Sequence, residues 1–170
     1  MTLAGDAIEI RYSRDLCDTA GNSAHAATFI RQRLIVLDAE LRRDPPEHRR
    51  ILTHELFHFV WVRLGNPKRT AWEALMRSEW NSRARGEAGW SAEWRKRELT
   101  AEDLRRRTRK WREYCCESFC DTAAWLEFFF GNGGRDLLPH NVSSELTLSQ
   151  RRLAARRRWF AEQLPESLPL

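Results

Sequence analysis

Residues 45–64 constrain the fold most, because they combine a helical apolar pattern with three groups that are costly to bury. Large apolar side chains cover most of the helical circumference, namely Leu52, Leu56, Phe57, Phe59, Val60, Trp61 and Val62. A helix that is apolar on nearly all sides is a buried one. The same segment contains His54, Glu55 and His58. Because unpartnered buried imidazoles and carboxylates are destabilising, the fold must supply partners for all three.

These three residues have the spacing of a metal site. His54 and His58 are four residues apart, so both imidazoles lie on one helical face and can bind one ion. Glu55 then projects toward a water molecule held by that ion. A divalent cation satisfies the imidazoles most directly, and we predict one zinc ion. In the structural alternative, both histidines make ordinary core hydrogen bonds and Glu55 reaches solvent.

A catalytic zinc ion needs a third protein ligand and an open position for water. Glu113, Glu117 and His140 compete for this role. Glu117 is favoured because small or apolar residues flank it and Asp121 follows one helical turn later. Asp121 can then accept a hydrogen bond from the second imidazole nitrogen of a ligand histidine, which we expect to be His54.

The N-terminal part of the chain predicts strands followed by a helix. Residues 8–12 and 28–38 have the apolar, β-branched character of strands, which indicates a small antiparallel sheet. Asp44 is a helix N-cap before two prolines, and the apolar pattern continues to Leu64, where Gly65 follows. We therefore expect a helix with a defined start and end.

Later residues predict further helices. Three capping boxes open them, formed by Thr70 with Glu73, Thr100 with Asp103, and Thr147 with Gln150. The second helix should end near Gly86, the long third one at Gly131 and the last near Pro165, while residues 86–99 are left unassigned. Strands that precede helices in this order indicate an α+β arrangement.

Composition indicates one domain that spans residues 1–170. The chain is 42% hydrophobic, with eight Trp and eight Phe, which suits one aromatic core. It has no apolar leader and no apolar run long enough to span a membrane, so we expect a cytoplasmic protein without a membrane partner. Three of the four Cys lie within residues 115–120, without zinc-knuckle spacing, and we interpret them as buried apolar residues.

Charge leaves two other classes of function open. Arginine-rich runs at residues 105–112 and 151–158 could attract nucleic acid, but solvated helix faces are the favoured interpretation, so nucleic-acid binding is not expected. The first alternative is a non-catalytic, zinc-stabilised binding module that contacts nucleic acid through these helices. It requires a fourth ligand, Cys116 or Cys120, and leaves Glu55 without a task. The second is a helical interaction protein without zinc.

Two motifs resemble those of the gluzincin metallopeptidases. HELFH at residues 54–58 matches their first zinc motif, and ESFCD at residues 117–121 matches the second, a glutamate with an aspartate four residues on. The chain is also similar to small bacterial zinc peptidases of the ImmA/IrrE type. The resemblance implies a zincin-like fold, in which the N-terminal sheet packs on a mainly helical body with a buried active-site helix. It also implies a rim strand, within residues 33–38, that pairs with an extended substrate.

The activity implied by this resemblance is hydrolysis of a peptide or protein substrate by a zinc-activated water, with Glu55 as general base. His140 and Tyr114 are the candidates for stabilising the transition state, although His140 also fits an exposed loop residue. The two motifs are further apart than in compact family members, because Trp-rich stretches at residues 72–80 and 90–94 separate them. These stretches either cover the cleft or enlarge the core.

Overall fold

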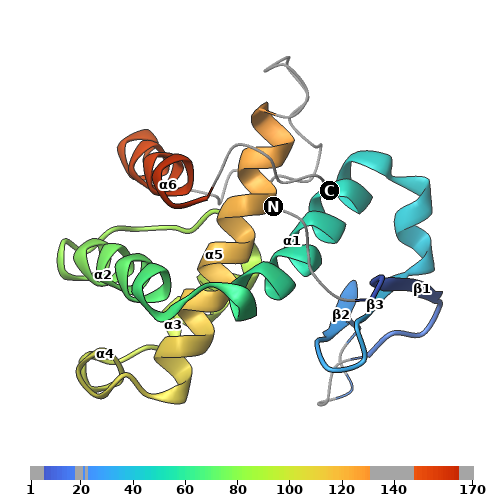
Figure 1. Cartoon of the computed structure of the whole chain (residues 1–170), viewed down its shortest axis with the longest axis horizontal. Coiled ribbons are helices and arrows are strands. Elements are labelled where there is room, and N and C mark those ends of the chain that lie inside the picture. Colours follow the sequence, from blue (N-terminus) through green and yellow to red (C-terminus); the bar gives the residue numbers. More distant parts are fainter. Residues whose placement is uncertain (1–5, 18–20, 22, 131–147, 165–170) are drawn as a thin grey trace.

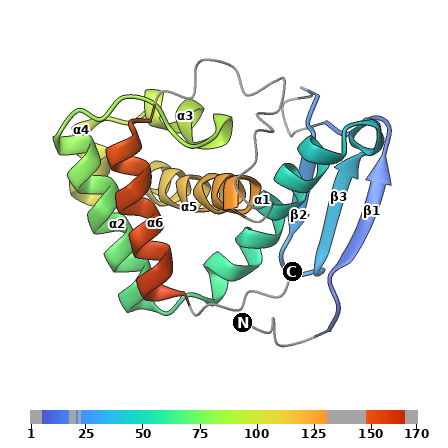
Figure 2. The same cartoon turned by 90° about the horizontal axis from the view of Figure 1, so that it is seen from above.

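The molecule has a small sheet at one end and helices elsewhere, and the computed structural model describes residues 6–17, 21, 23–130 and 148–164. The strands are β1 (Glu9–Ser13), β2 (Ala26–Phe29) and β3 (Leu34–Asp38), followed by the 3₁₀ helix η1 (Ala39–Arg43). The α-helices are α1 (Pro45–Arg63), α2 (Asn66–Asn81), α3 (Trp90–Arg97), α4 (Ala101–Arg106), α5 (Arg109–Phe130) and α6 (Gln150–Gln163). The sheet lies beside α1, α5 occupies the middle, and α2 and α6 lie on the far side (Figure 1, Figure 2). The α+β class is confirmed.

The sheet is mixed, which corrects the expectation of an antiparallel one. Its order is β1-β3-β2, with β1 parallel and β2 antiparallel to β3. The expected single strand at residues 28–38 is a hairpin, because residues 30–33 form a turn in which Arg33 has a φ of 50°. No local pattern in the sequence reports whether β1 runs parallel or antiparallel to β3.

One face of the sheet packs on α1. In β3, Ile35 and Leu37 are fully buried and their neighbours are half buried. This period of two directs alternate side chains of the strand toward the helix. The resulting cluster contains Ile35, Leu37, Leu41, Ile51 and Phe59. The sheet therefore fixes α1 from one side.

The ends of α1 agree with the sequence signals. The carboxylate of Asp44 accepts the backbone N–H of Glu47 at 3.1 Å, and two prolines follow the cap. Proline suits this first turn because its missing N–H has no helical partner there. The helix ends at Arg63, and Leu64 is extended before Gly65.

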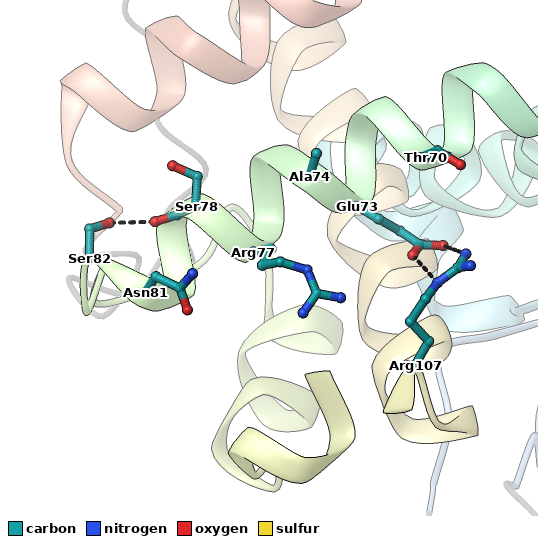
Figure 3. Close-up of a pocket in the computed structure, with 8 residues that line it drawn as sticks. All are labelled: Thr70, Glu73, Ala74, Arg77, Ser78, Asn81, Ser82 and Arg107. Atoms are coloured by element: carbon teal, nitrogen blue, oxygen red, sulfur yellow. Dashed lines mark hydrogen bonds and ion pairs between the residues drawn. The ribbon is translucent and has the colours of Figure 1, made fainter. Parts of the chain in front are cut away.

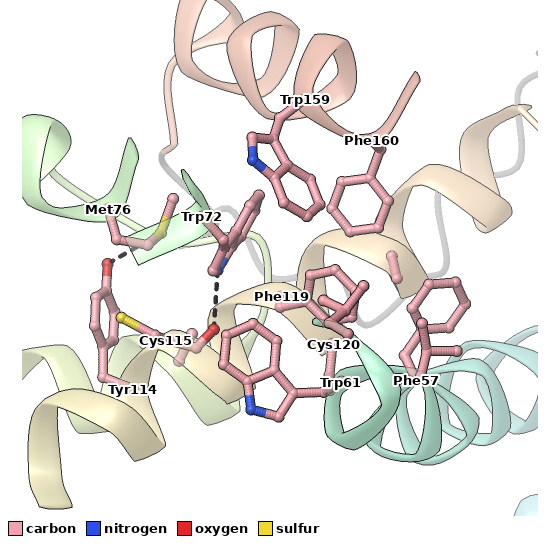
Figure 4. Packing of buried hydrophobic residues seen from close by; sticks show 14 of the residues in the cluster. Phe57, Trp61, Trp72, Met76, Tyr114, Cys115, Phe119, Cys120, Trp159 and Phe160 are labelled. Carbon is pink, nitrogen blue, oxygen red and sulfur yellow. Dashed lines mark hydrogen bonds between the residues drawn. The ribbon is translucent and has the colours of Figure 1, made fainter. Parts of the chain in front are cut away.

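The main core is aromatic and lies between α1, α2, α5 and α6 (Figure 4). Phe119 of α5 stacks on Phe160 with ring centroids 5.0 Å apart, and it meets the ring of Trp72 edge-on at 5.7 Å. Trp72 also donates its indole N–H to the carbonyl oxygen of Cys115 at 2.9 Å. Burial of these large rings holds α5 in place. Among the described elements, α5 is the one on which α1 packs most extensively.

Two helix predictions require correction. α2 begins before Thr70, so the expected capping box is absent there, and Glu73 instead accepts two hydrogen bonds from Arg107 at 2.9 Å. The expected long third helix is two helices, α4 and α5. They are separated where Arg107 adopts a left-handed conformation with a φ of 49°. The capping box at Thr100 does open α4 as predicted.

The remaining predicted boundaries lie close to or beyond the described ranges. α6 follows Ser149, whereas Gly131, Thr147 and Pro165 lie outside the described residues. The unassigned residues 86–99 contain α3. The four cysteines are free thiols. No helix in the described part of the chain has both the length and the apolar character needed to cross a membrane.

A buried ion network joins α2, α3, α5 and α6. Arg156 lies 2.6 Å from Glu79 and 2.7 Å from Glu87, and none of these three side chains is exposed. Glu87 also contacts Lys96 at 2.8 Å and accepts the hydroxyl of Tyr114 at 2.6 Å. Burial raises the pKa of Glu87, but the positive charges of Arg156 and Lys96 outweigh burial and hold it at about 2. The ionised network fixes α3 against its neighbours.

Candidate metal centre

The structure brings the three predicted ligands together between α1 and α5. Glu117 Oε2 lies 3.2 Å from His54 Nε2 and 4.0 Å from His58 Nε2. Zinc bonds of roughly 2.0–2.2 Å in a tetrahedral site place ligand atoms roughly 3.5 Å apart. Both distances are close to this separation, so Glu117 lies where its carboxylate could share an ion with either histidine.

The other nitrogen of each imidazole has its own partner. His54 Nδ1 lies 2.8 Å from Asp121 Oδ1, and His58 Nδ1 lies 3.5 Å from Cys116 Sγ. A partner on Nδ1 fixes the ring orientation and leaves the lone pair of Nε2 available to bind a metal ion. Asp121 thus occupies the position predicted for it, beside His54.

Asp121 is itself held by the beginning of α3. The backbone N–H of Ala92 donates to Asp121 Oδ2 at 2.8 Å, so the positive end of the helix faces the carboxylate. A Cβ at Gly89, the residue before this helix, would overlap the Asp121 carboxyl group. Glycine therefore permits this close approach. This contact left only a weak trace in the sequence, a glycine before a Trp-rich stretch. The residue that Gly89 approaches, Asp121, lies on another helix.

Glu55 lies beside the proposed ligands, with its carboxylate held from the sheet. Thr28 of β2 donates its hydroxyl to Glu55 Oε2 at 2.6 Å. Glu55 is close to fully buried but lines the adjoining space, so its carboxylate can reach a water molecule there. Thr28 was missed by sequence reasoning, because a contact between a strand and a helix has no spacing signature.

Two adjoining cavities form a cleft between β2 and α3. The smaller, of about 320 Å³, includes His54, Glu55, His58 and Glu117 in its lining. The larger, of about 610 Å³, is lined by Ser23, Ala24, His25, Ala26, Arg50, Ile51, His54, Glu55, Trp90, Ser91, Trp94, Arg95 and Asp121. Both contain His54 and Glu55. The proposed reacting groups thus face a space large enough for a ligand.

β2, and not the expected residues 33–38, forms the strand edge at this cleft. β3 is paired on both sides and has no free edge. Asp38 donates its N–H to the carbonyl oxygen of His25, so these two residues form a hydrogen-bonded pair. Along an antiparallel ladder, hydrogen-bonded pairs alternate with pairs whose backbone groups point outward. The backbone groups of Ala26 and Thr28 therefore point away from β3, and both residues line the smaller cavity.

The charges around the imidazoles favour a cation. Burial lowers the pKa of His54, but Asp121 and Glu117 outweigh burial and raise it well above its usual value. Burial raises the pKa of Glu117, but His54, His58 and Arg95 lower it to about 2. Arg95 contributes through its Nη2, which lies 3.3 Å from Glu117 Oε1. The ionised carboxylate of Glu117 can therefore offset the charge of a bound cation.

Cys120 is a competing donor. The ligand atoms of His54, His58 and Cys120 lie within 4.8 Å of one another, so this buried group could also hold a metal ion. Burial raises the pKa of the Cys120 thiol well above its usual value, which disfavours the thiolate needed for ligation. Glu117 is the better donor, because its ionised carboxylate faces the Nε2 atoms of both histidines.

Of the other predicted candidates, Tyr114 and Glu113 do not line the cleft. Tyr114 is fully buried, donates to Glu87 and lines neither cavity. Glu113 pairs with Arg109 at 2.6 Å on the surface. His140 lies outside the described residues. Arg95, whose guanidinium lies 3.3 Å from Glu117, is a cationic side chain beside the proposed ligands.

A separate hollow of about 640 Å³ lies along α2 (Figure 3). It shares no lining residue with the cleft. Glu73 is the one carboxylate in its lining and is paired with Arg107, while no His or Cys lines it. This hollow therefore lacks the cluster of imidazole and carboxylate groups that lines the cleft.

Comparison with protein-family models, curated proteins and solved structures gives no match for this chain.

Proposed function

We propose that this protein is a zinc metallopeptidase that binds one ion through His54, His58 and Glu117. The observation that carries the proposal is the convergence of the three side chains, with Glu117 Oε2 3.2 Å from His54 Nε2 and 4.0 Å from His58 Nε2. Two imidazoles and one carboxylate form the donor set of a catalytic site that keeps one position open. The contact between Asp121 and His54 supports the same assignment.

Glu55 is the general base in this proposal. The chemistry that zinc supplies at such a site is a bound water with a pKa of roughly 7 and a polarised carbonyl group. Thr28 holds Glu55 Oε2, so Oε1 is available to take a proton from that water. The resulting carboxylic acid then donates the proton to the leaving amine. Asp121 meanwhile keeps the ring of His54 in its orientation.

The edge of β2 with which no other described strand pairs favours a peptide substrate. The outward backbone groups of Ala26 and Thr28 can pair with an extended chain, as an added strand. Such pairing places a peptide bond beside Glu55, because Thr28 contacts Glu55 directly. A zincin-like relationship is part of this proposal, supported by the order of sheet, HExxH helix and glutamate helix.

The alternative, a non-catalytic zinc-stabilised module that binds nucleic acid, has one observation in its favour. Cys120 lies near both histidines and would close the site as a fourth ligand. The arginine-rich helices support it less, because Arg105 and Arg106 pair with Glu102 and Arg109 pairs with Glu113. In that case Glu55 would have no role.

The decisive experiment compares wild-type protein with Glu55→Gln for zinc content and for cleavage of a quenched-fluorescence peptide library. We expect one zinc per chain in both proteins and cleavage by wild type alone, because Glu55 acts on water and does not ligate the ion. Glu113→Gln, a surface carboxylate on α5, is the matched control and should retain both properties.

Other outcomes would overturn the proposal. Loss of zinc by Glu55→Gln would make Glu55 a ligand, and equal cleavage by both proteins would remove its role as base. A zinc-loaded wild type that cleaves no library member would favour the non-catalytic, zinc-stabilised module. Treatment with a chelator should also lower the melting temperature, because the clustered ligands then lose their common partner.

A further inference from the structure

Two exposed tryptophans on α3 line the larger cavity of the cleft. Trp90 is 63% exposed and Trp94 is 47% exposed. Tryptophan contributes most when its large ring is buried, so paired exposure next to a cavity points to a ligand surface. The other large exposed apolar residues in the described part of the chain are Ile10, Phe29 and Val62, and none of them lines either cavity.

The exposure of these rings follows from how α3 packs. Ala92, between them in sequence, is fully buried, and its N–H binds Asp121. Lys96 reaches inward to Glu87. Trp90 and Trp94 are one helical turn apart and so share one face of α3. The buried side of the helix therefore holds both indoles at the cleft.

The cavity beside these rings is continuous with the proposed reaction site. Its lining includes His54 and Glu55, together with residues 23–26, which are small except for His25. An extended peptide on the edge of β2 directs alternate side chains to opposite sides. One of these side chains would enter the space of about 610 Å³ beside the indoles.

The charges near the rings restrict what can bind. Indole faces attract cations in general. Here the guanidinium of Arg95 already lies 5.1 Å from the Trp94 ring, and that of Arg97 lies 5.7 Å from the Trp90 ring. Each indole thus already has a cationic neighbour, so a basic side chain gains little from the rings, whereas an aromatic side chain gains contact with both of them.

We propose that Trp90 and Trp94 form a specificity subsite for an aromatic side chain of the peptide substrate. The subsite rests on the proposed peptidase function, and it adds the substrate class. It also gives a function to one of the Trp-rich stretches between the two zinc motifs, at the wall of the cleft.

The test measures peptide binding to zinc-loaded Glu55→Gln, so that cleavage does not interfere. The probes are dansyl-labelled glycine-serine peptides with one phenylalanine moved through every position, and matched peptides with alanine there. At one position phenylalanine should improve the dissociation constant about tenfold or more over alanine. In Trp90→Ala/Trp94→Ala the improvement should fall below about threefold, whereas Trp90→Phe/Trp94→Phe should retain it.

Val62→Ala is the control for loss of an exposed apolar side chain outside the cleft, and it should keep the preference. All variants are compared at equal zinc content, which reports an intact site. An undiminished preference in Trp90→Ala/Trp94→Ala, no preference at any position, or no binding by any peptide would overturn the subsite. A preserved Trp-dependent preference without cleavage by wild type would overturn the peptidase function alone.

Discussion

At the scale of single residues, each histidine divides its two nitrogens between different partners. In His54 the Nδ1 atom faces Asp121 and the Nε2 atom faces Glu117. In His58 the corresponding partners are Cys116 and Glu117. The two outer contacts differ in length, because Asp121 Oδ1 lies 2.8 Å from His54 Nδ1 whereas Cys116 Sγ lies 3.5 Å from His58 Nδ1. His54 should therefore be the more tightly oriented of the two.

This difference predicts a graded effect of α5 variants on zinc binding. Glu117→Ala should lose most of its zinc, because a ligand is removed. Asp121→Ala should bind about 10- to 100-fold more weakly, because Asp121 orients His54 but does not ligate the ion in the proposed site. Isothermal titration of zinc into the apo variants measures both effects.

Two further variants serve as controls for this series. Glu113→Ala should bind zinc as wild type does, because its carboxylate pairs with Arg109 on the surface. Cys120→Ser should also retain zinc. Full-strength binding by Glu117→Ala together with loss in Cys120→Ser would transfer the third ligand position to the cysteine.

Residues within one helix were predictable, whereas partners from other elements were not. The four-residue spacings of His54 with His58 and of Glu117 with Asp121 are local, and the sequence displays them directly. Thr28 contacts Glu55 across 27 positions, and no sequence pattern reports such a contact. Arg95 was likewise hidden, because its helix was not assigned.

At the scale of elements, boundaries with local caps were predicted and those set by tertiary contacts were not. Asp44 and its prolines define the start of α1 within a few residues. The break between α4 and α5 occurs at Arg107, and arginine has no preference for a left-handed conformation. Arg107 pairs with Glu73 of α2, so its position depends on packing between helices.

The start of α3 predicts a further effect that depends on close packing. Gly89→Ala should lower stability and weaken zinc binding, because its Cβ overlaps the Asp121 carboxyl group and displaces the partner of His54. Gly65→Ala is the matched control, since the nearest atom to its Cβ is Pro67 Cδ at 3.7 Å. Thermal melts and zinc titrations of both variants measure the difference. Equal behaviour of the two variants would contradict the packing described for α3.

At the scale of the whole molecule, the buried ion network predicts loss of stability in acid. Glu87 has a folded-state pKa of about 2, below its ordinary value of 4.5. Its contribution is therefore fully present above pH 4.5 and is lost as the pH falls through this range toward 2. Denaturant unfolding as a function of pH should show this decline, with a slope of up to about 1.4 kcal/mol per pH unit for one proton.

Two variants attribute the decline to this network. Glu87→Gln should show a shallower acid limb, because it removes the titrating group. Lys96→Gln removes a positive charge at 2.8 Å from the carboxylate, so the folded-state pKa of Glu87 should rise and the decline should level off at a higher pH than in wild type. Acid limbs identical to wild type in both variants would contradict the role given to Glu87.

The same network has a consequence for the order in which the molecule is assembled. Glu79 and Arg156 are 77 positions apart, and α6 supplies the arginine. Until α6 docks, Glu79 lacks the Arg156 cation that permits its burial, and Glu87 has Lys96 as its remaining cationic partner. Contacts of such long range form late in folding. Under the proposed function, a nascent or partly folded chain would therefore stay inactive until α6 has docked.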